Sequence, residues 1–147
     1  MLKPILLVED NPNDLELSLT ALAQSGLANE VVVMRDGAEA RDYLLRQGKY
    51  AGTPLDCPAV VLLDLKLPKI DGLELLKIIR EHPSTSKLPV VILTSSREEK
   101  DVTAGYHLGS NAYVVKPVEF SAFFKAIQDL GIFWAVLNEP PPGAVRS

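Results

Sequence analysis

Five short apolar runs recur along the chain, and within them the apolar residues do not alternate with polar ones. The runs are rich in valine, isoleucine and leucine, as are strands that are buried on both faces of a parallel sheet. They comprise Ile5–Val8, Val31–Met34, Val60–Leu63, Val90–Leu93 and Ala112–Val115. We therefore expect five strands in the interior of the protein.

Apolar residues recur at helical spacing after each of these runs. In the first such segment Leu15, Leu19 and Leu22 fall at i, i+4 and i+7, and Gly26 can end the helix. Four more helices are expected: around Tyr43 to about Gly48, around Leu76 to before Pro83, from about Arg97 to Leu108, and from Phe120 to Leu130. A strand followed by a helix, five times over, predicts an α/β fold. This (βα)5 fold is a doubly wound parallel five-stranded sheet with helices on both faces.

Length and composition limit the class of protein. The chain has 147 residues, of which 47% are hydrophobic, enough for one domain with its own core. No apolar run is long enough to span a membrane, and the residues before the first strand do not match a secretory signal, so we expect neither a membrane span nor a signal peptide. The single cysteine, Cys57, fits a reducing cytoplasm. The net charge of −4 argues against nucleic-acid binding, which needs a basic face.

Acidic residues follow two of the expected strands directly. Glu9 and Asp10 come after the first run, and Asp64 ends the third, the most hydrophobic segment of the chain. Ligands of open α/β sheets bind outside the carboxyl ends of the strands. If these two strands are neighbours, three carboxylates converge, and their mutual repulsion is relieved by a divalent cation. Mg²⁺ takes oxygen ligands, usually one or two carboxylates with waters and a phosphate, so a Mg²⁺ site is expected.

Each of these acids taken singly has a simpler interpretation, because acids are common in turns and at helix N-caps. All three together favour the metal site. Two further strand ends carry groups that suit a phosphoryl oxygen: the hydroxyl of Thr94 after the fourth run and the ammonium of Lys116 after the fifth. Taken alone, Thr94 is an ordinary strand residue and Lys116 a solvated charge.

Four motifs, "LLVEDN", "LLDLKLPKIDG", "VVILTSS" and "AYVVKP", occur in this order, each closing an expected strand. With them the chain resembles the CheY-like receiver domain of bacterial two-component response regulators, over roughly Lys3 to Leu130. The resemblance implies the flavodoxin-like strand order 2-1-3-4-5. It also implies a cytoplasmic signalling protein that accepts a phosphoryl group from a histidine kinase and at most slowly dephosphorylates itself.

The resemblance assigns roles to the residues of the acidic cluster. Asp64 would be the phosphoacceptor. Asp10 and Asp64 would bind Mg²⁺ directly, with Glu9 completing the acidic pair. The backbone carbonyl of Lys66 would be the third protein ligand.

The resemblance also implies a switch. Thr94 would hydrogen-bond the phosphoryl group, Lys116 would pair with it, and Pro117 would follow a cis peptide bond. The movement of Thr94 would let Tyr113 turn inward and repack the face made by the fourth helix, fifth strand and fifth helix. Tyr113 also fits an ordinary amphipathic strand, and both interpretations stay open.

Two features are not generic for such a domain. The connection "RQGKYAGTPLDCP" exceeds the usual length of an αβ loop. We expect residues 1–132 to form the receiver domain and residues 133–147 a C-terminal extension, without an attached output domain. In it Phe133 and Trp134 either cover the domain's own surface or anchor a dimer, where aromatic residues are enriched. Both features resemble the regulators that accompany bacterial and cyanobacterial phytochromes, which implies a light-sensing kinase as phosphodonor and a homodimer.

Two other functions compete with this interpretation. A phosphatase of the haloacid-dehalogenase type also forms an aspartyl phosphate, but it resembles a D-x-D pattern, and here the second position is Lys66. The second competing function is that of a binding module, a receiver domain that no longer accepts a phosphoryl group. A dinucleotide-binding fold is disfavoured, because the first strand is followed by "EDNPND" and no G-x-G-x-x-G is present there.

Overall fold

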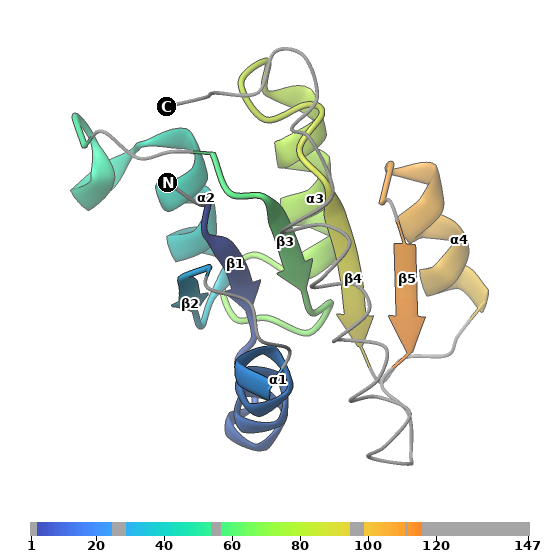
Figure 1. The fold of residues 1–147 in the computed structure, drawn as a ribbon. Helices are drawn as coiled ribbons and strands as arrows, with labels where there is room; N and C mark the ends of the chain where they lie inside the picture. The colour runs from blue at the N-terminus through green and yellow to red at the C-terminus, as the bar shows by residue number, and fades with distance from the viewer. Residues whose placement is uncertain (1–2, 25–28, 54–56, 95–98, 111, 116–147) are drawn as a thin grey trace.

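The computed structural model is a layered α/β structure (Figure 1). It describes residues 3–24, 29–53, 57–94, 99–110 and 112–115. Its strands are β1 (Ile5–Val8), β2 (Val31–Met34), β3 (Val60–Leu63), β4 (Val90–Thr94) and β5 (Ala112–Val115). Its helices are α1 (Pro12–Gln24), α2 (Gly37–Leu45), the short 3₁₀ helix η1 (Gly48–Tyr50), α3 (Gly72–Glu81) and α4 (Glu99–His107). The expected fifth helix lies outside the described residues.

All five strands are parallel and lie in the order β2-β1-β3-β4-β5, so the predicted strand order is confirmed. The five apolar runs coincide with the strands, and β4 is one residue longer, ending at Thr94. In the pairing of β1 with β3, Ile5 lies beside Val60 and Val8 beside Leu63. The residues that follow these two strands therefore leave the sheet at the same level.

The sheet separates two apolar clusters, because successive strand residues point to opposite faces. One face of β1 and β3 presents Leu6, Val8, Val61 and Leu63 to helices α2 and α3. The other presents Ile5, Leu7, Val60 and Leu62 to helix α1. Figure 1 shows α1 on its own side of the sheet, apart from α2 and α3. Burial on both faces explains why the strands read as unbroken apolar runs.

Polar side chains fix where the helices α1, α2 and α3 begin. The carboxylate of Asp36 accepts a hydrogen bond from the Glu39 amide at 2.7 Å, and that of Asp71 accepts one from the Glu74 amide at 2.9 Å. The side-chain oxygen of Asn11 accepts from the amides of residues 13 and 14 at 2.9 and 3.1 Å. Each bond satisfies an amide that a helix N-terminus leaves without a partner. The helices therefore start at set distances from the strand ends.

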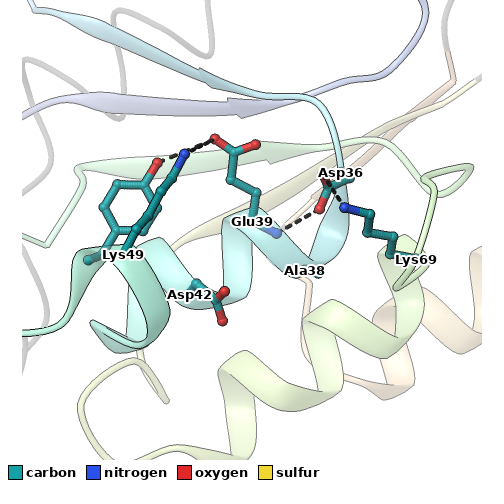
Figure 2. Close-up of a pocket in the computed structure, with 7 residues that line it drawn as sticks. Asp36, Ala38, Glu39, Asp42, Lys49 and Lys69 are labelled. Carbon is teal, nitrogen blue, oxygen red and sulfur yellow. Dashed lines mark hydrogen bonds and ion pairs between the residues drawn. The ribbon is translucent and has the colours of Figure 1, made fainter.

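The long connection between α2 and β3 folds back onto α2 through η1. The ring of Tyr50 packs edge to face on that of Tyr43, with centroids 5.4 Å apart, and its hydroxyl donates to Glu39 at 3.3 Å. Lys49 pairs with Glu39 at 3.5 Å, and this carboxylate raises the pKa of the Lys49 ammonium. The same surface carries a shallow pocket of about 330 Å³, which Figure 2 shows between η1 and the loop bearing Lys69. The 3₁₀ helix η1 in this connection therefore packs against α2.

Arg80, near the end of α3, joins three segments of backbone. Its guanidinium donates to the carbonyl of Gly109 at 2.7 and 2.9 Å, to that of Leu88 at 2.6 Å and to that of Ser86 at 3.3 Å. Burial lowers the pKa of this guanidinium from its usual value, yet it stays charged at neutral pH. Arg80 therefore ties the end of α3 to the turn before β4 and to the residues after α4.

Replacing Arg80 with methionine should lower the free energy of unfolding by about 2–3 kcal/mol. Three backbone carbonyls lose a charged hydrogen-bond donor, and because the surroundings of Arg80 are partly buried, water replaces that donor only in part. Urea denaturation measures this loss. The control is Lys77→Met on the same helix, where the side chain is exposed and a change within about 0.5 kcal/mol is expected. If Arg80→Met and Lys77→Met were equally stable, the hydrogen bonds from Arg80 to these three carbonyls would not stabilise the fold.

The helices that the structure describes are too short or too polar to span a lipid bilayer.

Candidate functional site

Glu9 and Asp64 lie side by side where β1 and β3 end. The Glu9 amide donates to the Met34 carbonyl and the Asp64 amide to the Val8 carbonyl, each at 3.0 Å, so both backbones continue the sheet by one residue. Both side chains are buried, with exposed fractions of 2% for Glu9 and 8% for Asp64. Two carboxylates removed from bulk water thus share one end of the sheet.

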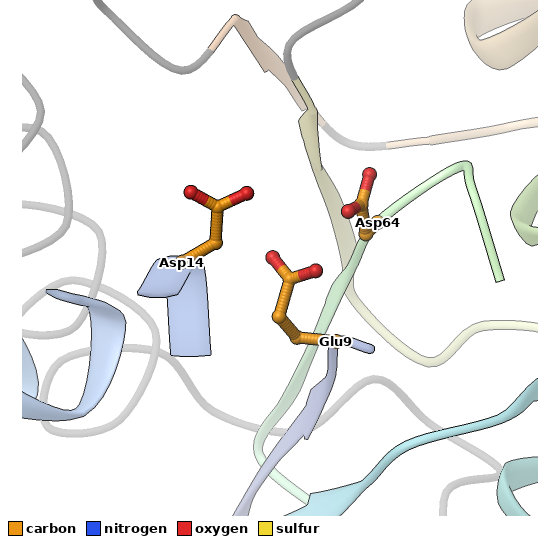
Figure 3. Close-up of side chains that lie close together, drawn as sticks. All are labelled: Glu9, Asp14 and Asp64. Carbon is orange, nitrogen blue, oxygen red and sulfur yellow. The ribbon is translucent and has the colours of Figure 1, made fainter. Parts of the chain in front are cut away.

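Asp14 brings a third carboxylate to this place from the other side (Figure 3). One carboxylate oxygen from each of Glu9, Asp14 and Asp64 lies within 4.8 Å of the others. Asp14 stands in the first turn of α1, which begins with Pro12 after the Asn11 cap. Proline is suited to the first helical position, and the cap fixes the turn that follows, so helix α1 holds Asp14 over the strand ends.

Backbone amides stabilise part of the charge in this cluster. The Leu65 amide donates to one oxygen of Asp64 at 2.7 Å, and the Asn11 amide donates to Glu9 at 3.3 Å. Three like charges at this separation still repel strongly when two of them are buried. The donor set consists of carboxylate oxygens alone, which is the chemistry that hard divalent cations such as Mg²⁺ prefer. The residues present therefore fit a divalent metal ion.

The sequence prediction for this cluster is matched in part by the geometry. Glu9 and Asp64 are brought together as expected. Asp10 is exposed and is not among the three carboxylates that converge, and Lys66 is exposed on the loop that follows Asp64. Asp14 was not singled out from the sequence. Its position could have indicated a role in the site, because Asp14 lies in the first turn of the helix that follows the acidic end of β1.

The loop from β3 to α3 is clamped by close backbone contacts. The Gly72 amide donates to the Leu65 carbonyl at 2.8 Å, and the Gly37 amide donates to the Pro68 carbonyl at 3.2 Å. Lys69 in this loop has φ +69°, and its ammonium lies 3.7 Å from the Asp36 carboxylate. The loop therefore packs against the starts of α2 and α3, which fixes the direction in which it leaves Asp64.

The remaining predicted residues lie on or beyond β4 and β5. Thr94 closes β4 and pairs with Val115, and Tyr113 pairs with Ile92, so both occupy the strands expected of them. The side chains of Thr94 and Tyr113 lie outside the described part of the structure. So do the residues Lys116, Pro117, Phe133 and Trp134.

Comparison with known proteins matches this chain to a receiver domain and to response regulators. Residues 5–128 match the response regulator receiver domain. Response regulator Rcp1 of Synechocystis sp. is 42% identical over 132 residues, which cover 90% of this chain and 88% of Rcp1. The Mn(2+)-bound form of response regulator Rcp1 has a crystal structure that aligns with a TM-score of 0.85 at 40% identity, over 95% of this chain and 99% of that one.

Two further solved structures are similar over nearly the whole chain. The phosphorylated cyanobacterial phytochrome response regulator RcpA has a TM-score of 0.87 and is 40% identical, covering 96% of this chain and 99% of its own. The bacteriophytochrome response regulator AtBRR is 65% identical with a TM-score of 0.76, covering 95% of this chain and 99% of its own.

Proposed function

The chain belongs to the response regulator receiver domain family, and from this premise we propose that it accepts a phosphoryl group on Asp64. It is a signalling protein whose partner is a histidine kinase. One observation carries the choice of residue: Asp64 is buried at the end of a central strand and faces two other carboxylates. The carboxylate follows the carboxyl end of β3, and ligands of open α/β sheets bind outside the carboxyl ends of the strands, so a phosphodonor would approach there.

We propose that the metal of the site is Mg²⁺. Receiver domains bind a divalent cation at an acidic pocket, and Rcp1 has a Mn(2+)-bound form. Asp10, Asp64 and the backbone carbonyl of Lys66 would hold the ion, with Glu9 beside them. When bound, the ion would offset negative charge on the phosphoryl oxygens.

The chain's own groups would then perform the transfer. An oxygen of Asp64 attacks the phosphorus of the kinase's phosphohistidine, and the bond from phosphorus to the histidine nitrogen breaks. The Leu65 amide already binds one oxygen of Asp64 at 2.7 Å and so orients the carboxylate. Lys116 would neutralise a phosphoryl oxygen, and Thr94 would donate a hydrogen bond to another. Positioning and charge compensation account for most of what phosphoryl transfer requires.

The response to phosphorylation would run through Thr94 and Tyr113. Thr94 ends β4, the strand next to β3, so a hydroxyl drawn toward the phosphoryl group would move within one sheet layer. Tyr113 lies on the neighbouring strand β5, where it could fill the space left behind. Pro117 would fix the backbone after Lys116. This switch would change the face made by α4, β5 and the fifth helix.

A bacterial phytochrome is the kinase that we propose as phosphodonor. Both RcpA and AtBRR are phytochrome response regulators, and each aligns with at least 95% of this chain. A light-sensing donor of this class would act in the cytoplasm, a reducing compartment that suits a chain whose single cysteine, Cys57, forms no disulfide.

The protein should form a homodimer. We assign residues 1–132 to the receiver domain and residues 133–147 to an arm that carries Phe133 and Trp134 into the partner, since aromatic residues are enriched in interfaces. Size-exclusion chromatography with light scattering at tens of micromolar, with and without phosphorylation, measures the state. A monomer under both conditions would contradict the dimer and leave the phosphoacceptor assignment intact.

The activity itself is tested by incubation with a kinase or a small phosphodonor, with and without Mg²⁺, read by intact mass. Transfer should require both Asp64 and the ion. We expect no turnover of a generic phosphate ester, because the position two after Asp64 is Lys66, whose side chain donates hydrogen bonds and has no carboxylate to serve as the acid-base of such a phosphatase. Rapid turnover of such an ester would favour a phosphatase.

A further inference from the structure

Asp14 is the member of the acidic cluster that the proposed phosphotransfer does not use. It comes from helix α1, whereas Glu9 and Asp64 come from strand ends, and it faces them across the mouth of the site (Figure 3). Its carboxylate is half-buried and lies within 4.8 Å of a carboxylate oxygen of Asp64. A phosphoryl group on Asp64 would therefore stand next to Asp14.

The charge of Asp14 limits what it can contact there. A carboxylate accepts hydrogen bonds and repels the anionic oxygens of a phosphoryl group, so it is a poor direct partner for that group. Mg²⁺ usually takes only one or two carboxylates and keeps several waters. With Asp10 and Asp64 proposed as its ligands, Asp14 would meet the site through water.

We propose that Asp14 positions the water that removes the phosphoryl group from Asp64. This inference rests on the proposed function. The water oxygen attacks phosphorus, the bond between phosphorus and the Asp64 oxygen breaks, and its electron pair returns to the carboxylate. One water proton passes to a phosphoryl oxygen, so the products are the free Asp64 carboxylate and inorganic phosphate. Asp14 accepts a hydrogen bond from the water and holds its oxygen toward phosphorus, a role that orienting residues play in nucleotide hydrolysis.

The local structure holds Asp14 in a fixed position, as such a role requires. The Asn11 side chain accepts a hydrogen bond from the Asp14 amide at 3.1 Å, and the Leu15 amide donates to the Asn11 carbonyl at 2.9 Å. The neighbouring Leu15 is buried in the apolar cluster under α1. The first turn is thereby anchored on both sides of Asp14, and the Asn11 amide in turn contacts Glu9.

The test compares decay of the phosphorylated protein in three variants, each labelled, freed of donor and followed by intact mass. Asp14→Ala removes the hydrogen-bond acceptor and should lengthen the half-life of the label about tenfold, less than the roughly 10²–10⁴-fold of a general base, because Asp14 orients the water and takes no proton from it. Asp14→Asn keeps an acceptor oxygen and should restore the half-life to within about threefold of the unaltered protein, as expected if orientation of the water matters more than charge. Glu16→Ala, an exposed acid on the same helix, should leave the half-life unchanged.

Calorimetric titration of each variant with Mg²⁺ separates this role from metal binding. We expect the Mg²⁺ affinity to stay within about threefold of that of the unaltered protein. Mutation of a residue that supports the metal ligands typically lowers metal affinity by about 10–100-fold. An unchanged half-life in Asp14→Ala would overturn the inference, and so would a tenfold loss of Mg²⁺ affinity, which would make Asp14 a ligand. Absence of label on Asp64 in the unaltered protein would instead refute the proposed function.

Discussion

Replacing Asp64 with asparagine is expected to abolish phosphorylation. The amide group lacks the anionic oxygen that attacks phosphorus, and removal of a covalent nucleophile costs on the order of 10⁶-fold in enzymes where it has been measured. Intact mass after incubation with a phosphodonor and Mg²⁺ should therefore show no added phosphoryl group. The fold should survive, because asparagine has nearly the same shape and its amide oxygen can keep the 2.7 Å hydrogen bond from Leu65.

The thermal midpoint of Asp64→Asn separates loss of the nucleophile from loss of structure. Neutralising one of three adjacent carboxylates relieves repulsion, so the midpoint should stay the same or rise in the absence of metal. Asp71→Asn is a matched control, since Asp71 is exposed and caps α3, and asparagine serves equally well as a cap. Asp71→Asn should label normally. Full labelling of Asp64→Asn would show that another residue accepts the phosphoryl group.

Replacing Gly72 with alanine should damage both the fold and the site. A methyl group at this position would lie 2.2 Å from the carbonyl oxygen of Asp64 and 2.6 Å from the Cα of Leu65. These are backbone atoms at the end of a central strand and cannot turn aside as a flexible side chain would. Overpacking of this kind costs about 1–3 kcal/mol, and we expect the upper end. Displacement of Asp64 should also slow labelling on the order of 100-fold, as small shifts of reacting groups do.

Gly52→Ala tells this clash apart from the general cost of replacing a glycine. Gly52 has φ +77°, and among the residues that the structure describes, its two chain neighbours aside, no atom lies within 4 Å of an added methyl group. We therefore expect the change to cost about 1 kcal/mol, the strain of the left-handed backbone. Urea denaturation and the initial rate of labelling measure both variants. Equal stability and equal labelling rates in Gly72→Ala and Gly52→Ala would contradict the close-contact argument.

The sequence by itself determined the strands, their order in the chain and part of the site. Residues such as Leu6 and Val61 face one side of the sheet while Leu7 and Leu62 face the other, so burial on both sides leaves a continuous apolar run that can be recognised locally. The acids at positions 9 and 64 end two such runs. Because the strands are parallel and neighbours, these acids had to meet at one edge.

Only the tertiary structure decided which other groups join them. Asp14 reaches the site because the Asn11 cap sets the first turn of α1 above the strand ends, and Gly72 is needed because helix α3 starts against the backbone of Asp64. Arg80 donates a hydrogen bond to the carbonyl of Gly109, 29 residues away, and no local sequence pattern predicts that contact. Apolar periodicity records which face of an element is buried, whereas the separations across a site depend on how caps and loops set whole elements against one another.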